Sequence, residues 1–401
     1  MFRKLFFRLF WRRRYWRNIE FDQLAELYTS RLLTVFAINI INLFAAVYLY
    51  KLGYSLLFIA LFYGVLYLFK VPLSYVAARI AAYFGPKHGI FYANLLRIPS
   101  LVAFAFVPEF GLWAVIVFGV FQQMSAVLYD LCYMVGFSKI KSTDRVGREI
   151  GNMQIIEKIA RVLSPVVGGV VASVYSPTVT IVVACTVFAV AALPLFRSME
   201  PTATKVRLKI SGFPWRLTAR TVVAETVVGF DFVTSGLVWT LFVTLIVFEK
   251  FGDGIYAALG ALASLSVLAS VVATWIFGQL VDRRKGGMLS TVGTIAKSVV
   301  HLFRPAIVTP AGVLGVNTSS ETASSAYIMP FTRLVFDTAD ASGFRITYLM
   351  FVSMATNVGA ALCALLLALF LWLFDEQFAM QALFIAAAFY QLLMLVARHN
   401  R

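Results

Sequence analysis

Several ionisable side chains lie inside long apolar runs of this sequence, where a charge is costly, and seven of them are candidates for a functional role. They are Arg97, Asp130, Glu157, Arg161, Lys297, His301 and Glu321. At membrane depth such groups pair with one another or line an ion or substrate pathway. A carboxylate that alternates between a protonated and an ion-paired state is what proton coupling requires. Asp130 and Glu321 are the first candidates for that role, and Glu157 is the next.

The positions of these residues predict specific partners. Asp130 and Arg97 lie about 9 Å and about 14 Å from the inner ends of their expected helices, at 1.5 Å per residue, so we expect them to pair. Glu321 and His301 also match in depth, and Lys297 competes for the same partner. Glu157 and Arg161 are four residues apart and share a helix face. A structural ion pair and a transport role both remain open for these residues.

Composition predicts an all-α polytopic membrane protein. The 401 residues are 61% hydrophobic and 13% charged, whereas soluble domains are about half apolar and about a quarter charged. Because a membrane helix needs about 20 residues, we expect twelve transmembrane helices. Their ranges are 31–50, 55–79, 88–107, 111–136, 150–174, 177–196, 221–248, 255–281, 288–308, 311–336, 346–373 and 377–397. The tenth is interrupted by Pro310 and Pro330, so it is either a broken helix or not a span.

Charge placement favours twelve crossings of the cytoplasmic membrane, with both termini cytoplasmic. The net charge is +16, and nearly all Lys and Arg outside the spans fall in alternate loops, as the positive-inside rule requires. Only Lys51, Lys250 and Arg304 are expected in outside loops. The basic, aromatic segment 1–30 predicts an amphipathic helix against anionic lipid headgroups, and nucleic acid is not an expected partner.

Two halves of the chain repeat one another. Lys51-Leu52-Gly53 recurs as Lys250-Phe251-Gly252, a shift of 199, and Ala25-Glu26 recurs as Ala224-Glu225 at the same shift. Arg97 corresponds to Lys297 at a shift of 200. These collinear matches predict two pseudo-symmetric six-helix bundles, residues 31–196 (the first half) and 221–397 (the second half), joined by a basic cytoplasmic linker at 197–220.

One charged loop carries a more specific signal. Gly278-Gln279-Leu280-Val281-Asp282-Arg283-Arg284-Lys285-Gly286 lies between two apolar runs. It resembles the loop that follows the second helix of each six-helix half in the major facilitator superfamily. The equivalent loop of the first half has Ala78 and Ala82 in place of the Gly and the Asp. The resemblance implies that Asp282, with Gly278, Arg283 and Gly286, forms a gating loop that engages a nearby helix end.

The resemblance extends over roughly residues 30–397. Ser164-Pro165-Val166-Val167-Gly168-Gly169 is similar to a Gly-Pro-x-x-Gly-Gly motif of antiporters, although small residues also serve close helix packing. In this superfamily the first, fourth, seventh and tenth helices line a central cavity. The cavity candidates that follow are Asn39, Asn42, Gln123, Asp130, Trp239, Asn317 and Glu321.

The sequence therefore predicts a secondary active transporter that moves a small solute by alternating access, with proton-coupled antiport or efflux as an addition. It could work as a monomer. No cofactor or metal is expected, because three Cys and three His show no metal-ligand spacing. Two alternatives remain: a non-transporting sensor or scaffold, and an enzyme of lipid or prenyl substrates that uses Asp337 and Asp340 at the membrane surface.

Overall fold

The computed structural model describes residues 19–41, 45–142, 145–175, 177–202, 204–248 and 255–397. This part of the chain is helical and contains no β-strand. Several sequence-based predictions fall outside the described residues: the segment 1–18, Asn42 and the repeat Lys250-Phe251-Gly252. The side chains of Pro165 and Gly169 are also outside them, although both residues belong to a described helix.

Each predicted membrane span overlaps a helix. The helices of the first half are α2 (Ile19–Ile41), α3 (Ala45–Lys51), α4 (Leu56–Phe84), α5 (Pro86–Ala105), α6 (Val107–Phe110), α7 (Leu112–Ile140), α8 (Val146–Val174) and α9 (Pro177–Ala191), with a 3₁₀ turn at Leu193–Arg197. Those of the second half are α10 (Trp215–Val233), α11 (Trp239–Phe242), α12 (Ile255–Asp282), α13 (Gly286–Phe303), α14 (Pro310–Ser342), α15 (Arg345–Leu373) and α16 (Glu376–Gln391). π-Helical turns at Thr234–Val238 and Val243–Val247 flank α11, and 3₁₀ turns at Arg304–Ala306 and Leu392–Ala397 follow α13 and α16.

Polar caps and Pro residues set the helix ends. Ser55 and Asp375 accept hydrogen bonds from backbone N–H groups in the first turns of α4 and α16, which satisfies donors that the helix leaves free. Thr309 caps α14 in the same way, and Pro310 occupies its first turn. The break predicted near Pro310 is therefore a helix start, and α14 continues through Pro330 as one helix of 33 residues.

Seven helical segments in the described part of the chain are long and apolar enough to cross a membrane. They are Leu56–Phe84, Leu112–Ile140, Val179–Arg197, Trp215–Val247, Ser264–Asp282, Arg345–Leu373 and Glu376–Ala397. The remaining predicted spans coincide with α2, α5, α8, α13 and α14. Each of these helices carries an ionisable residue that is mostly shielded from solvent: Arg31, Arg97, Lys158, Lys297 and Glu321. Their weaker apolar character thus reflects charges that lie between helices.

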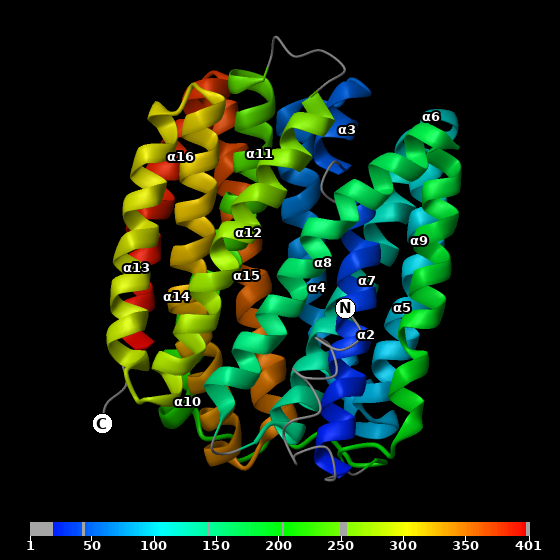
Figure 1. Cartoon of the computed structure of the whole chain (residues 1–401), viewed down its shortest axis with the longest axis vertical. Helices are drawn as coiled ribbons and strands as arrows, with labels where there is room; N and C mark the ends of the chain where they lie inside the picture. Colours follow the sequence, from blue (N-terminus) through cyan, green and yellow to red (C-terminus); the bar gives the residue numbers. More distant parts are fainter. Residues whose placement is uncertain are drawn as a thin grey trace, which may run out of the picture.

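The helices of the two halves lie side by side (Figure 1). Helices α5, α7 and α9 occupy one side of the molecule and α13, α14 and α16 the other, with α8 and α12 between them. The two halves meet mainly where α4 contacts α15 and where α8 contacts α12. One hydrophobic core extends across this boundary, because the Phe137 and Phe336 rings lie 5.5 Å apart. The buried Lys158 of α8 also lies at this boundary, where it pairs with Glu321 of α14.

Close packing of α10 on α15 depends on two glycines. A Cβ atom at Gly229 would lie 1.8 Å from the Thr356 carbonyl oxygen, and one at Gly359 would lie 1.8 Å from that of Thr226. We expect Gly229→Ala to destabilise the protein by about 1–3 kcal/mol or more, because the two backbones must separate. The melting temperature in detergent measures this effect. Gly315→Ala on α14 is the control, since nothing lies within 4 Å of its Cβ position; equal melting temperatures for the two variants would contradict the prediction.

Candidate functional site

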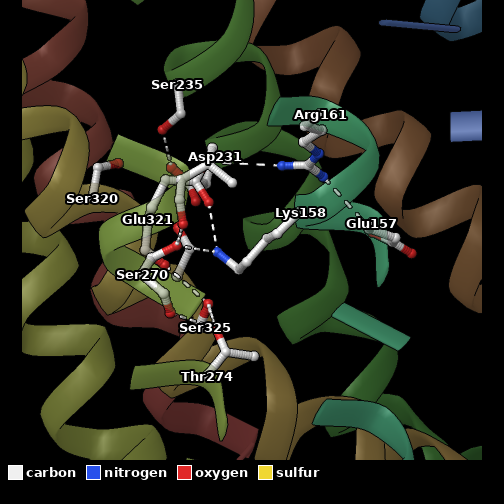
Figure 2. A network of polar contacts seen from close by, with 12 residues as sticks. Glu157, Lys158, Arg161, Asp231, Ser235, Ser270, Thr274, Ser320, Glu321 and Ser325 are labelled. Carbon is white, nitrogen blue, oxygen red and sulfur yellow. Dashed lines mark hydrogen bonds and ion pairs between the residues drawn. The ribbon is translucent and has the colours of Figure 1, made fainter. Parts of the chain in front are cut away.

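An ion pair between α8 and α14 joins the two halves deep in the molecule. The Lys158 Nζ atom lies 2.9 Å from Oε2 of Glu321 and donates a hydrogen bond of 2.7 Å to the Ser270 hydroxyl of α12. One helical turn further along α8, the Arg161 guanidinium lies 3.8 Å from the other carboxylate oxygen of Glu321. Both basic side chains point from α8 toward Glu321 (Figure 2). A single carboxylate of the second half thus faces two cations of the first.

The charges continue from α8 into the first half. Glu157 lies 3.8 Å from Arg161 and accepts a hydrogen bond of 2.8 Å from Nε of Arg31 on α2. Arg31 also lies 3.7 Å from Asp130 on α7 and stands over the ring of Tyr133, 4.6 Å from its centroid. Charges of alternating sign therefore run from α7 through α2 and α8 to α14. This chain of ion pairs connects all three candidate coupling carboxylates, Asp130, Glu157 and Glu321.

The ends of this chain remain accessible. The side chain of Asp130 is 59% exposed and that of Glu321 is 31% exposed, whereas Lys158 is only 6% exposed. Both carboxylates therefore have oxygen atoms or side-chain surface outside the packed core, unlike the ammonium group of Lys158. Such carboxylates can bind a cation or exchange a proton, which a fully sealed ion pair cannot.

A second polar cluster lies within the second half, centred on Asp231 of α10. Its carboxylate lies 3.2 Å from Nζ of Lys297 and 3.0 Å from Nε2 of His301, both on α13. The hydroxyl of Tyr327 donates a hydrogen bond of 2.6 Å to it, and that of Ser235 one of 2.7 Å. Asp231 is therefore a buried carboxylate with four polar partners. It lies next to the π-helical turn Thr234–Val238, an irregularity often found at functional sites.

Arg304 extends this second cluster. Its guanidinium contacts the His301 ring at 3.1 Å and the hydroxyls of Ser235 and Ser320, and it stands 5.0 Å from the ring centroid of Trp239. Lys297 also donates to the Ser320 hydroxyl, at 2.7 Å. Because Ser320 precedes Glu321 on α14, the two clusters meet at neighbouring residues of one helix. A shift of α14 would change both sets of contacts together.

The loop Gly278–Gly286, predicted as a gating loop, contacts a helix end of the first half. Asp282 accepts hydrogen bonds from the backbone N–H groups of Gly147 (2.7 Å) and Arg148 (3.2 Å), at the start of α8. A carboxylate is favourable there because helix N-termini carry free donors and a partial positive charge. Gly278 allows the close approach, since a Cβ at this residue would lie 3.1 Å from the Gly147 carbonyl oxygen. Asp282 of the second half thus caps a helix of the first. The backbone N–H of Arg283 donates to the Gln279 carbonyl oxygen, and Gly286 begins α13.

Two predicted pairings are wrong and one is confirmed. Asp130 pairs with Arg31, and within the described residues Arg97 forms no ion pair. Glu321 pairs with Lys158, because His301 and Lys297 turn toward Asp231 on α10. Depth alone could not distinguish these partners, since it does not give the direction a side chain takes around its helix. The pair of Glu157 with Arg161 forms as predicted.

The neutral cavity candidates have mixed environments. Trp239 donates a hydrogen bond of 2.6 Å from Nε1 to Asn317, which joins α11 to α14. Asn39 donates to the Val35 carbonyl oxygen of its own helix, and Gln123 is buried. In the helix-five motif, Ser164 donates to the Ala160 carbonyl oxygen, and Gly168 lies against Ile40 of α2. Gly168 therefore serves close packing of α8 on α2.

Four basic residues with buried or partly buried side chains were not among the predicted site residues. Lys158 precedes Arg161 by three residues and so shares its helix face, which was a usable signal. Arg304, expected in an outside loop, is 1% exposed and belongs to the buried cluster. Arg31 stands near a predicted span end and gave no signal of burial. Lys70, the fourth, lies mid-way along α4 and is also buried.

The acidic residues proposed for an enzyme are engaged elsewhere. Asp340 pairs with Lys141 at 2.7 Å and with Arg345, and Asp337 lies 3.7 Å from Arg333. Among the described residues, no group of three or more His, Cys, Asp or Glu side chains is placed to hold a metal ion. These contacts make Asp337 and Asp340 a charged surface between helix ends.

The long apolar helices define a multi-pass membrane protein. The sequence profile of the Major Facilitator Superfamily matches residues 27–364. The chain therefore belongs to the Major Facilitator Superfamily. A comparison with curated proteins found no match.

Solved structures of transporters share this fold. The human organic anion transporter MFSD10 (TETRAN) superposes with a TM-score of 0.73 at 10% identity, covering 96% of this chain and 100% of that one. A bacterial homologue of the iron transporter ferroportin, in an outward-facing state, gives 0.69 at 13% identity and covers 93% and 98%. The transporter FucP, in the outward conformation, gives 0.67 at 10% identity and covers 94% and 99%. At these identities the likeness concerns the fold.

Proposed function

We propose that this protein is a secondary active transporter that moves a small solute across the cytoplasmic membrane by alternating access. The first half (31–196) and the second half (221–397) would rock against each other, with 197–220 as the linker. The observation that carries the proposal is the contact of Lys158 and Arg161 with Glu321 across the boundary between the halves. Rocking must break or rearrange this contact, so its strength biases the two states.

Asp282 forms a second contact between the halves, at the end of the molecule where the linker lies. Its bonds to the first turn of α8 tie the two halves together on the side of the linker. Lys141 and Asp340 form a second tie on that side, between the ends of α7 and α14. Opening this side requires all these bonds to be released. A solute or proton that weakens the deep pair at Glu321 would make that release more favourable.

We propose that the transporter is a proton-coupled antiporter that exports its solute in exchange for a proton. Glu321 is the carboxylate that we propose to bind this proton. A protonated Glu321 loses its attraction to Lys158 and Arg161, whereas an ionised Glu321 holds both. The exposed fraction of its side chain gives protons a route to the carboxylate. Asp130, at the other accessible end of the ion-pair chain, is the second candidate.

Gradient-driven flux in proteoliposomes tests this proposal. The wild type would be assayed under an imposed pH gradient with labelled organic anions, organic cations, sugars, amino acids and ferrous iron, a panel that includes the solute classes named for the structural neighbours. Glu321→Gln is expected to abolish gradient-driven flux while leaving solute exchange. Asp337→Asn, a change in an exposed pair within α14, is the control and should leave both unchanged.

Two outcomes would contradict the proposal. Unchanged gradient-driven flux in Glu321→Gln would show that Glu321 is not the proton-coupling residue. The same comparison with Asp130→Asn would then test the second candidate. No flux of any solute by folded wild-type protein would overturn transport and favour a sensor or scaffold of the same fold.

A further inference from the structure

Two buried cations of the first half have no carboxylate in contact. Lys70 lies mid-way along α4 and Arg97 mid-way along α5, with exposed fractions of 9% and 4%. Among the described residues neither forms an ion pair within 4 Å, and the Nε and Nη1 atoms of Arg97 have no hydrogen-bond partner. The Lys70 ammonium lies over the Tyr67 ring and the Arg97 guanidinium over the Phe188 ring. Both charges therefore rest mainly on aromatic faces.

The Asn94 amide adds a further free donor to this site. Asn94 precedes Arg97 by three residues on α5, which places the two side chains on one helix face. It is 2% exposed, and its Nδ2 atom has no hydrogen-bond partner. Helices α4 and α5, which carry Lys70 and Arg97, both pack on α7, the helix of Asp130. The site is thus rich in donors and short of acceptors.

In the second half, the residue that corresponds to Arg97 has a carboxylate partner. Lys297, which corresponds to Arg97 at a shift of 200, is neutralised by Asp231. Subtracting the repeat shift of 199 or 200 from residue 231 gives Leu32 and Arg31 in the first half, and neither is an acid. The carboxylate that neutralises the second half therefore has no counterpart in the first. Asp130 does not replace it, because it pairs with Arg31.

Unpaired buried charges are costly, so a counter-ion from outside the chain is favoured here. The side chain of Asp130 is 59% exposed, so accessible space reaches α7, which packs on both α4 and α5. Arg and Lys donors of this kind bind the oxygen atoms of a carboxylate, phosphate or sulfonate. The middle of α4 and α5 lies away from the membrane surface, where lipid headgroups reside, and this favours a free anion over a lipid.

We propose that Lys70, Arg97 and the Asn94 amide form a binding site for the oxyanion group of the transported solute. The inference rests on the proposed transport function and names the solute class: a small organic anion with at least one carboxylate, phosphate or sulfonate. The bound oxyanion supplies the negative charge that Asp231 supplies in the second half. Because α7 packs on both α4 and α5 and its Asp130 pairs with Arg31, the site lies beside the helix where the ion-pair chain to Glu321 begins.

Thermal stability of the purified full-length protein in an uncharged detergent tests the site. Benzoate, glutarate and inorganic phosphate would be titrated at constant ionic strength. At least one of them is expected to raise the melting temperature in a saturable way, with at least tenfold weaker binding in Arg97→Gln and in Lys70→Gln. Lys139→Gln removes an exposed cation from the end of α7 and should leave the response unchanged.

Asn94→Asp keeps the test decisive if the Arg97 variant does not fold. This change places a carboxylate one helical turn from Arg97, so we expect a higher melting temperature without added anion and no further rise with it. A response to the anions equal to that of the wild type in Asn94→Asp or Arg97→Gln would overturn the site. So would stabilisation by phosphatidylglycerol in mixed micelles but by none of the three free anions, which would assign the cations to a lipid headgroup.

Transport measurements distinguish this inference from the proposed function. Anion binding that is lost in Arg97→Gln, in a protein that moves no solute, would leave the site standing and contradict transport. The protein could instead move a cationic or neutral solute, with a gradient-driven flux that is the same with added anions and in Asn94→Asp. That result would support transport and contradict the anion site.

Discussion

Replacing Asp231 with Asn is expected to lower the free energy of unfolding by about 3–5 kcal/mol, the usual cost of removing one partner from a buried ion pair. The change preserves the size of the side chain but removes the charge opposite Lys297, which is 1% exposed. Arg304, also 1% exposed, would remain in the same cluster. The His301 and Tyr327 contacts would persist only as neutral hydrogen bonds, which are about half as strong.

The melting temperature and the denaturation midpoint in detergent measure this loss. Asp337→Asn is the control, because its exposed pair with Arg333 contributes about 0–1 kcal/mol at most. Combining Asp231→Asn with Lys297→Met should recover part of the loss, since the double variant no longer buries an unpaired ammonium group. A single Asp231→Asn variant as stable as the wild type would show that the cluster is not held together by charge.

The positions of the helices could be predicted from the sequence because apolar runs and turn residues determine them locally. The loop Gly278–Gly286 shows how far this extends, since its motif predicted that Asp282 reaches a helix end, and Asp282 does bind the first turn of α8. The course of α14 could not be predicted as well, because Pro310 and Pro330 indicated a break. Pro310 lies in the first turn, where Pro is tolerated, and Pro330 lies within a membrane-protein helix, where Pro is also tolerated.

The partners of the charged residues could not be predicted in the same way. The depth of Arg97 and of Asp130 along their helices was compatible with a pair, yet Asp130 turns toward Arg31 on α2. Choosing among Lys158, Lys297 and His301 for Glu321 requires the rotation and crossing of four helices, which no local pattern encodes. Lys158 shares a helix face with Arg161, but the spacing of the two residues does not tell which helix that face meets.

Exchanging the charges of Lys158 and Glu321 is expected to reveal their coupling directly. Lys158→Glu alone places three carboxylates around Arg161, and Glu321→Lys alone places three cations together, since Lys158 and Arg161 both face residue 321. Each single change should reduce gradient-driven flux about a hundredfold, equivalent to about 2.7 kcal/mol at 1.36 kcal/mol for each factor of ten. The double variant restores opposite charges and should recover at least tenfold of the lost flux.

A double-mutant cycle on stability provides a second measurement that needs no known solute. Melting curves of the two single variants and the double variant should give an interaction energy of about 0.5–3 kcal/mol, the range for residues in one ion-pair network. Additive effects of the two changes would contradict a functional pair. The double variant could recover stability without recovering flux. The ion pair would then hold the halves together, and binding of the proton or solute would require a carboxylate at residue 321 of α14. Recovery of both would mean that the attraction between α8 and α14, whichever helix carries the carboxylate, controls the exchange between states.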